Sequence, residues 1–311
     1  MTGKIFLDGG AGYIGSVLIG YLLDEGYKVT CFDNLLYDKT SLLAYCSHKN
    51  FNFIKGDVRN FELLKKEISK HDIIIPFSAL VGAPLCEKNP LDAKLVNFEH
   101  VKYLAKNKSK DQLLLYNNSN SGLGETDGKS LATEETEFNP ISLYGKTKYF
   151  AELAVRESEN HLVFRLATIF GKSFRPRNDL LVNNLVLRAL KDRVLIVYEG
   201  HYIRNYLHIR DVCKAFVFAL DNWDKCKNEV YNLGNDNLNM SKLDLCKKIN
   251  EYIPVEIIEA QYTKDLDKRN YKISSQKFYN KGFQCEYSLD DGIKELMQVY
   301  KMIDVPQYAN Y

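Results

Sequence analysis

Tyr144 and Lys148 place a phenol and an ammonium four residues apart, in a segment of helical character that follows Asn139-Pro140. Residues at this spacing lie on one face of a helix. A nearby cation stabilises the tyrosinate and lowers the pKa of the phenol from its ordinary value of about 10. The pair therefore predicts a general base that works near neutral pH.

The same spacing occurs at Tyr45 and Lys49, so position must separate the two matches. Tyr45 precedes the third predicted strand, whereas Tyr144 opens the helix after the fifth. Ser119 follows that fifth strand in a loop of small polar residues, where its hydroxyl can share the proton being removed. Ser119, Tyr144 and Lys148 form the candidate catalytic set; for Ser119 taken alone, an ordinary loop serine is the alternative.

A glycine-rich turn near the N-terminus predicts a site for phosphate groups. The strand-like residues 4–7 run directly into Asp8-Gly9-Gly10-Ala11-Gly12-Tyr13-Ile14-Gly15. Glycines let the backbone approach a pyrophosphate, and a helix expected from about Tyr13 supplies free N–H groups and the positive end of its dipole. Two registers fit, Gly10-Gly12-Gly15 and Gly9-Gly12-Gly15, and both indicate a dinucleotide cofactor.

Asp33 ends the second predicted strand about twenty residues beyond this turn, where an acidic side chain binds a ribose 2′-hydroxyl. No Lys or Arg follows until Lys39, so a carboxylate at this place would repel a 2′-phosphate. We therefore expect NAD rather than NADP. The alternative is that Asp33 and Asn34 merely open a loop.

Strand-like and helical segments alternate through the first half of the chain, with strands expected near 4–8, 27–32, 51–55, 72–77, 112–117 and 161–166. This alternation predicts an α/β fold, a Rossmann-like doubly wound parallel sheet whose ligands lie at the carboxyl ends of the strands. We expect residues 1–170, with 209–234 returning, to bind NAD. Residues 171–208 and 235–311 are predicted to form a smaller mixed α/β lobe for the substrate.

Composition narrows the class of protein. The chain has 311 residues, 45% of them apolar, and a formal charge of +2, which gives no field for nucleic acid or an anionic membrane. Seven scattered cysteines without a CxxC pair argue against disulfides and structural zinc, so no metal is expected. The chain starts with a strand and has no apolar run of membrane-spanning length, and we expect a cytoplasmic protein.

Together these residues resemble the extended short-chain dehydrogenase/reductases, the group of NAD-dependent sugar-nucleotide epimerases and dehydratases. The resemblance favours the Gly9-Gly12-Gly15 register and implies that Ser119, Tyr144 and Lys148 are the catalytic triad. It also implies cofactor contacts at Gly9, Gly12, Tyr13, Ile14, Gly15, Asp33, Asn34, Asp57, Val58, Ser78, Ala79, Leu80, Tyr144 and Lys148. The implied substrate contacts are Ser119, Asn120, Ser121, Asn183, Arg204 and Arg269, with Arg204 pairing with the substrate diphosphate.

The chain departs from the family pattern at several positions. Asp8 stands where Thr or Ser is usual, and a carboxylate beside a pyrophosphate is costly unless it turns away. Pro76 replaces a common histidine, and Leu123 a common tyrosine. Asn120 and Ser121 occupy the places of the acid pair of the dehydratases, and neither can serve as that acid, which disfavours dehydration.

The resemblance implies oxidation of a nucleotide-activated sugar at carbon 4. Segments 75–84, 118–122 and 165–171 are similar to a subgroup that includes bacterial capsule enzymes, some of which oxidise a GDP-linked heptose, and this favours a 4-dehydrogenase. A 4-epimerase of the UDP-glucose/galactose type is the alternative, and a non-catalytic NAD-sensing protein is a third. A homodimer formed through helices at about 93–106 and 142–158 is also implied.

Overall fold

A seven-stranded parallel sheet organises the protein, seen in a computed structural model that describes residues 3–37, 39–124, 130–260 and 270–303. The strand order is β11-β7-β5-β4-β1-β2-β3, which confirms the doubly wound α/β fold. The sheet is built from β1 (Lys4–Asp8), β2 (Lys28–Asp33), β3 (Phe51–Lys55), β4 (Ile73–Pro76), β5 (Leu113–Ser119), β7 (His161–Leu166) and β11 (Glu229–Leu233).

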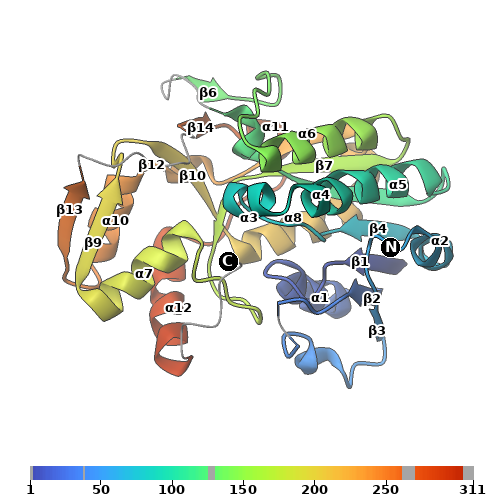
Figure 1. Cartoon of the computed structure of the whole chain (residues 1–311), viewed down its shortest axis with the longest axis horizontal. Helices are drawn as coiled ribbons and strands as arrows, with labels where there is room; N and C mark the ends of the chain where they lie inside the picture. The colour runs from blue at the N-terminus through green and yellow to red at the C-terminus, as the bar shows by residue number, and fades with distance from the viewer. Residues whose placement is uncertain (1–2, 38, 125–129, 261–269, 304–311) are drawn as a thin grey trace.

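Helices cover both faces of this sheet (Figure 1). On one face lie α1 (Gly15–Asp24) and α8 (Ile209–Asp221); on the other lie α2 (Phe61–Ile68), α5 (His100–Asn107) and α6 (Leu143–Arg156). Successive residues of β1 serve opposite cores, since Ile5 and Leu7 pack beneath α1 and α8 while Phe6 packs beneath the other helices. A strand buried on both faces has to be apolar throughout, as Ile73-Ile74-Ile75 is.

Local capping fixes where the catalytic helix begins. Ser142 precedes α6 with extended backbone, and its side chain accepts a hydrogen bond from the N–H of Gly145 at 3.1 Å. Tyr144 therefore lies in the first turn of α6 and Lys148 one turn later, on the same side of the helix. The helix at the glycine turn starts at Gly15, two residues later than we expected, because Gly12 to Ile14 form the turn itself.

A second lobe has its own core. It is formed by α7 (Leu181–Asp192), β9 (Val194–Tyr198), α10 (Lys242–Asn250), β13 (Glu256–Ala260) and α12 (Leu289–Met302). Figure 1 shows this lobe to one side of the large sheet, beyond the ends of its strands. A separate three-stranded sheet, in the order β12-β10-β8, pairs segments that are distant in the sequence: β8 (Thr168–Phe170), β10 (Ile203–His208) and β12 (Asn239–Ser241).

Segments from late in the chain also pack into the large sheet and its core. Strand β11 lies in the large sheet, within the segment 209–234 that we assigned to it. The short helix α11 (Gln276–Tyr279) falls in the segment assigned to the substrate lobe, yet Phe278 and Phe283 pack into the core of the large sheet. Aromatic burial thus ties the end of the second lobe to the first.

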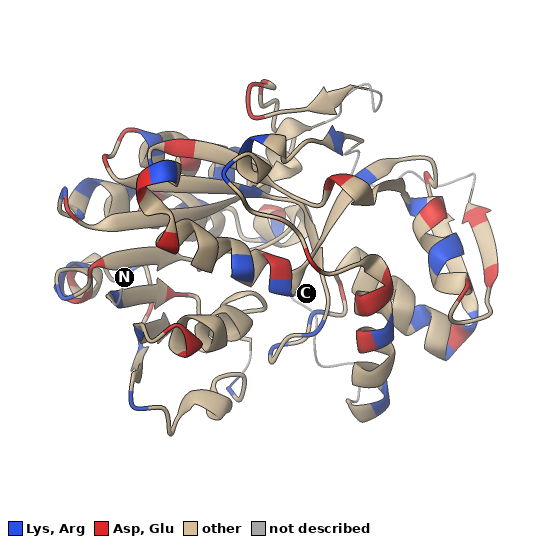
Figure 2. Cartoon of the chain, turned by 180° about the vertical axis from the view of Figure 1, so that it is seen from behind, with Lys and Arg blue, Asp and Glu red and all other residues tan. Residues whose placement is uncertain are grey.

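Charge is spread over the surface without a dominant sign. Lys and Arg alternate with Asp and Glu along the same helices in the view of Figure 2, in keeping with a formal charge of +2. No helix among the described residues combines the length and apolar character needed to cross a membrane.

Candidate active site

A cleft of about 1240 Å³ opens at the carboxyl ends of the parallel strands and reaches the second lobe. Open α/β sheets bind ligands at this end of their strands. The cleft lies where the strand order reverses, between β4 and β1. The predicted residues that line it are Gly9, Gly12, Tyr13, Ile14, Gly15, Asp33, Asn34, Asp57, Val58, Ser78, Ala79, Leu80, Ser119, Ser121, Tyr144, Lys148 and Arg204.

The glycine turn has the shape of a phosphate cradle. Gly9 has a φ of +68°, and a Cβ there would lie 2.4 Å from the backbone nitrogen of Ser78, so only glycine fits. Gly10 does not line the cleft: a Cβ on it would meet Cys31 Sγ at 2.5 Å, on the core side of the turn. The N–H groups of Tyr13 and Ile14 donate to no acceptor among the described residues, so they fit an anionic pyrophosphate.

Asp33 is held in place at the end of β2. One carboxylate oxygen accepts from the N–H of Ala11 at 3.0 Å and the other from the N–H of Leu35 at 2.8 Å. Burial raises the pKa of this carboxyl, while the backbone hydrogen bonds oppose the rise. The carboxylate thus joins the glycine turn to the next loop and keeps lone pairs for ribose hydroxyls.

Asp57 lines the same end of the cleft but is engaged with a neighbour. The Arg59 guanidinium forms a forked pair with it, at 2.9 and 2.6 Å, and lowers the pKa of the Asp57 carboxyl to about 2. Arg59 also contacts Asp92 at 2.7 Å. Asp57 is therefore a fixed anion at one of the cofactor contacts that the resemblance implies.

The candidate catalytic residues come from two elements that meet at the cleft. Ser119 is the last residue of β5, and its Oγ accepts hydrogen bonds from the Ser121 N–H at 3.2 Å and the Ser121 hydroxyl at 3.0 Å. The Ser119 hydroxyl hydrogen is thereby left to donate to a substrate. Tyr144 and Lys148 reach the same cleft from α6.

Lys148 is a buried cation. Its ammonium donates to the carbonyl of Asn117 at 2.5 Å and lies 4.2 Å from the ring centre of Tyr116. Burial lowers the pKa of the Lys148 amine to about 7, and the charges of Asp8 and Glu152 oppose this fall. The amine is thus poised to change charge in the neutral range.

A buried ion pair supports the serine loop from behind. Glu152, one turn after Lys148 on α6, accepts from Arg165 at 2.7 and 3.1 Å and from the amide of Asn118 at 2.5 Å. Asn118 in turn accepts from the N–H of Ser119 at 2.8 Å. These contacts fix the end of β5 relative to α6, and therefore Ser119 relative to Tyr144.

The second lobe supplies cations to the opposite wall of the cleft. Arg204 and Lys242 line it with 3% and 4% of their surface exposed, so they are held inside rather than spread on the surface. Arg204 lies 5.7 Å from the ring centre of Tyr271. The sequence predicted Arg204; it gave no motif for Lys242, which follows Ser241 at the start of α10.

Two predicted substrate contacts lie away from the cleft wall, and one lies outside the described residues. Asn120 is fully buried, and its amide has no hydrogen-bond partner among the described residues. Asn183 accepts from the N–H of Gly171 at 3.1 Å and donates to the carbonyl of Arg177 at 3.0 Å, so it holds a loop; its neighbour Asn184 lines the cleft instead. Arg269 lies outside the described residues.

Residues 171–178, which we call the strap, cross from the second lobe onto the glycine turn. The Ser173 hydroxyl donates to the carbonyl of Tyr13 at 2.6 Å and lies 3.1 Å from the Ser16 hydroxyl. The Tyr13 hydroxyl donates to the Gly171 carbonyl at 2.7 Å. Further along, the Arg175 guanidinium lies 4.9 Å from the ring of Tyr37, in the loop after Asp33.

The strap therefore brings Arg175 and Arg177 to the cleft, which the sequence had shown only as a charge-rich loop. Arg177 pairs with Asp179 through a short contact. Both arginines are nearly buried, although neither belongs to a recognisable motif.

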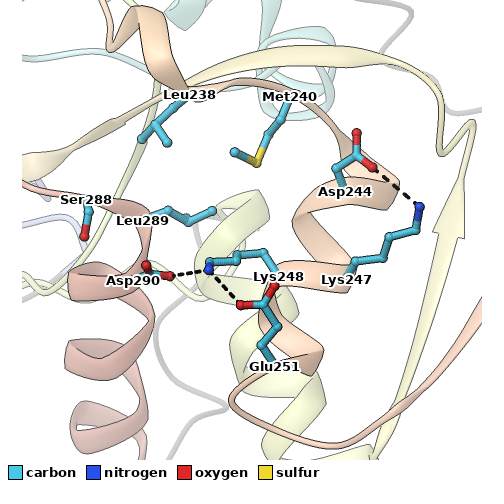
Figure 3. A pocket seen from close by; sticks show the side chains of 9 residues that line it. All are labelled: Leu238, Met240, Asp244, Lys247, Lys248, Glu251, Ser288, Leu289 and Asp290. Atoms are coloured by element: carbon cyan, nitrogen blue, oxygen red, sulfur yellow. Dashed lines mark hydrogen bonds and ion pairs between the residues drawn. The ribbon is translucent and has the colours of Figure 1, made fainter.

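A smaller cavity of about 320 Å³ lies in the second lobe, and its charged lining residues form ion pairs with one another. Figure 3 shows its charged side chains paired with one another: Lys248 with Asp290 at 3.1 Å and Glu251 at 2.7 Å, and Lys247 with Asp244 at 3.6 Å. Its floor is Leu238, Met240 and Leu289. Nor do the described residues bring together three or more His, Cys, Asp or Glu side chains that could hold a metal ion.

Comparisons with known proteins agree with this geometry. The chain is 29% identical to the low-salt glycan biosynthesis protein Agl12 of Haloferax volcanii, over 95% of this chain and 98% of the relative. It is 27% identical to the UDP-glucose 4-epimerase of Lactobacillus helveticus, over 79% and 81% of the two chains.

Solved structures share the fold over nearly the whole chain. The dTDP-glucose 4,6-dehydratase of Bacillus anthracis, solved in complex with NAD, superposes with a TM-score of 0.83 at 26% identity and 96% coverage of both chains. The UDP-glucose 4-epimerase of Thermotoga maritima has the same fold, with a TM-score of 0.82, 23% identity, and 97% and 100% coverage.

The sequence model of the NAD dependent epimerase/dehydratase family matches residues 5–234, which include the glycine turn, Asp33 and all three candidate catalytic residues. This protein belongs to that family of enzymes, and its cofactor is NAD.

Proposed function

We propose that this enzyme oxidises carbon 4 of a nucleotide-activated sugar, with Tyr144 as the general base. The supporting observation is that Ser119, Tyr144 and Lys148 line one cleft with the glycine turn at one end and Arg204 with Lys242 on the wall of the second lobe. A sugar nucleotide carries a diphosphate, and a planar guanidinium suits its oxygens better than an ammonium does. The cleft thus has room for both a dinucleotide and a charged substrate.

Each residue of the triad has a separate task. Tyr144, as tyrosinate, removes the proton from the hydroxyl on carbon 4, and the Lys148 ammonium stabilises that tyrosinate. Ser119 donates its hydroxyl hydrogen to the same substrate oxygen and keeps it aligned. NAD, when bound, accepts the hydride that leaves carbon 4, so that the sugar loses two electrons and becomes a ketone.

The fate of the ketone distinguishes two versions of this function. We propose first a 4-dehydrogenase that releases the ketone, with a GDP-linked heptose of capsule or surface polysaccharide synthesis as the substrate, since the loop motifs are similar to those of such enzymes. The second version is a 4-epimerase, in which hydride returns to the other face of the sugar. The name of the Lactobacillus relative favours it.

Dehydration is not part of the proposal. Ser121 holds the Ser119 hydroxyl instead of offering a carboxylic acid, and Asn120 is buried beside it. A dehydratase needs an acid in this loop to protonate the leaving hydroxyl.

The test is to incubate the purified enzyme with NAD and a panel of GDP-, UDP- and dTDP-sugars, following NADH by absorbance and the sugar by NMR. Accumulation of a 4-keto product with equimolar NADH supports the dehydrogenase. An inverted carbon 4 without net NADH supports the epimerase and overturns the dehydrogenase version. Loss of the hydroxyl at carbon 6 would overturn both.

Tyr144→Phe separates catalysis from NAD sensing. We expect it to lower turnover by about 10²- to 10⁴-fold, the usual contribution of a general base, while NAD affinity falls by about tenfold at most, the cost of one lost hydrogen bond. Tyr149→Phe, a partly buried tyrosine on the same helix that does not line the cleft, is the matched control. Unchanged turnover in Tyr144→Phe would refute the assigned base.

We further propose that the enzyme is a homodimer formed through α5 and α6. Val101 and Leu104 of α5 are buried within the chain and are not available to a partner. Phe150 of α6 has 49% of its surface exposed and lies 6.0 Å from the ring of Phe98, which leaves an aromatic pair on the outer side of these helices.

A further inference from the structure

Asp8 and His100 form a buried pair directly behind the glycine turn. Asp8 is the last residue of β1, and His100 is the first residue of α5, after a π-helical turn at Leu95–Glu99. Both side chains are fully buried, and Asp8 Oδ2 lies 3.0 Å from His100 Nε2. A buried carboxylate needs partners of this kind, because an isolated one is costly.

The hydrogen-bond partners of the imidazole determine where protons must be. Nδ1 of His100 lies 2.9 Å from the carbonyl of Val96, which can only accept, so Nδ1 carries a hydrogen. Nε2 faces the carboxylate of Asp8. Either the imidazole is doubly protonated beside a carboxylate, or it is neutral and accepts from a protonated Asp8. Both arrangements contain one shared proton and have no net charge.

Asp8 also holds the wall of the cofactor site. Its Oδ1 accepts from the N–H of Ser78 at 2.9 Å, and Ser78 lines the cleft beside Gly9. Leu80, two residues after Ser78, is held in a similar way: Asn97 accepts from its N–H at 2.8 Å and donates to its carbonyl at 3.0 Å. The helical segment that carries Asn97 and His100 therefore fixes the stretch from Ser78 to Leu80.

We propose that Asp8 and His100 are a positioning pair for the cofactor: they hold one proton between them, fix the backbone of Ser78, and place no net negative charge behind the pyrophosphate site. This accounts for a carboxylate at a position where the family resemblance implies Thr or Ser. A side chain at position 100 that cannot hold this proton would leave one uncompensated charge behind Gly9 and weaken NAD binding.

Other ionisable groups surround the pair. Lys148 of α6 interacts electrostatically with Asp8 and has the opposite charge. Asp33 and Cys31 of β2 also interact with Asp8, and burial raises the pKa of both. An uncompensated charge on Asp8 would add to that of Asp33 at the same end of the cleft, and Lys148, whose amine has a pKa lowered to about 7, would balance it only in part.

Variants separate the charge of the pair from its shape. In Asp8→Asn, the amide oxygen can still accept from Ser78 and the amide nitrogen can donate to Nε2 of a neutral imidazole, so the contacts remain while the proton becomes unnecessary. In His100→Gln, a side chain of similar reach can donate to Asp8 but cannot hold a proton for it. The double variant restores neutrality.

The experiment measures the NAD dissociation constant by calorimetry at pH 7 in the absence of any sugar. We expect Asp8→Asn to bind within about threefold of wild type. His100→Gln should bind at least about tenfold more weakly, and Asp8→Asn/His100→Gln should recover to within about threefold. Because no substrate is present, the result does not depend on which sugar the enzyme oxidises.

His71→Gln is the matched control, since His71 is buried and its Nδ1 contacts the carbonyl of Glu67 at 2.7 Å, but it does not line the cleft. Its NAD affinity should be unchanged. If His100→Gln folds and binds NAD like wild type, or if the double variant is no better than His100→Gln, the proposal fails. Should His100→Gln not fold, Asp8→Asn decides: NAD binding at least about tenfold weaker than that of wild type overturns the proposal that the pair is neutral.

Discussion

Lys148 carries a cost in stability that its place in the cleft explains. Burial lowers the pKa of its amine to about 7 in the folded protein, whereas an unfolded lysine titrates near 10.4. The folded state therefore binds the proton more weakly than the unfolded state does. The resulting destabilisation is complete below about pH 7 and disappears as the pH rises toward 10.

Lys148→Met should therefore stabilise the NAD-free enzyme while removing activity. We expect the free energy of unfolding at pH 7 to rise by ~1–3 kcal/mol, less the lost contact with Asn117, and its increase between pH 7 and 10 to vanish. Chemical denaturation over this pH range is the measurement. Lys146→Met, which changes an exposed lysine of the same helix, is the control. Equal stability of Lys148→Met and wild type at all pH values would contradict this account.

At the scale of elements, the strap is the contact that joins the second lobe to the glycine turn. Ser173 supplies the hydroxyl that bonds Tyr13 and faces Ser16, and all three side chains are buried. Gly171 has a φ of +112°, and a Cβ there would lie 2.7 Å from His208 Nε2, so the start of the strap is fixed by packing. The strap is thus fixed directly onto the glycine turn.

Ser173→Ala should loosen this contact without harming the fold. Removal of a neutral buried hydrogen bond costs about 0.5–1.5 kcal/mol. We expect a threefold to tenfold weaker NAD affinity on that basis, with secondary structure unchanged, as measured by calorimetry and circular dichroism. Ser158→Ala removes a hydroxyl that bonds the Val155 carbonyl at 2.7 Å away from the cleft, and should leave NAD binding as it is. An effect of equal size in both variants would rule out a specific role for the strap.

The strap also shows what the sequence could not predict. The strands, the glycine turn and the helix of Tyr144 followed from local patterns, because apolar runs such as Ile73-Ile74-Ile75 and glycine spacing act within a few residues. Arg175 and Lys242 reach the cleft only through packing between distant segments. Nor did any local signal connect Asp8 with His100, whose side chain lies 92 positions further along the chain.

At the scale of the whole molecule, one outer surface carries an aromatic pair. The helices α5 and α6 bury their inner sides against the sheet, and Phe150 of α6 lies 6.0 Å from the ring of Phe98 in the turn before α5. A second copy of the chain would cover this pair, as the proposed homodimer requires.

Phe150→Glu should convert the dimer to a monomer, because a carboxylate at the centre of an apolar contact has no partner there. Sedimentation velocity at several protein concentrations measures the change. Ile196→Glu, at a position 52% exposed on β9 of the second lobe, should leave the assembly intact. A wild-type protein that is monomeric at all concentrations would refute the proposed dimer.

The strap bonds the glycine turn on the side that faces the second lobe. We expect exchange of NADH for NAD to break those bonds, so that strap opening sets the rate of cofactor exchange. If the ketone leaves the cleft before the strap opens and the hydride is trapped on the cofactor, each turnover waits for exchange. If the ketone first rotates inside the cleft so that its other face meets the cofactor, the hydride returns to carbon 4 and no exchange is needed. The same chemistry then yields a dehydrogenase or an epimerase, according to whether release of the ketone or its rotation is faster.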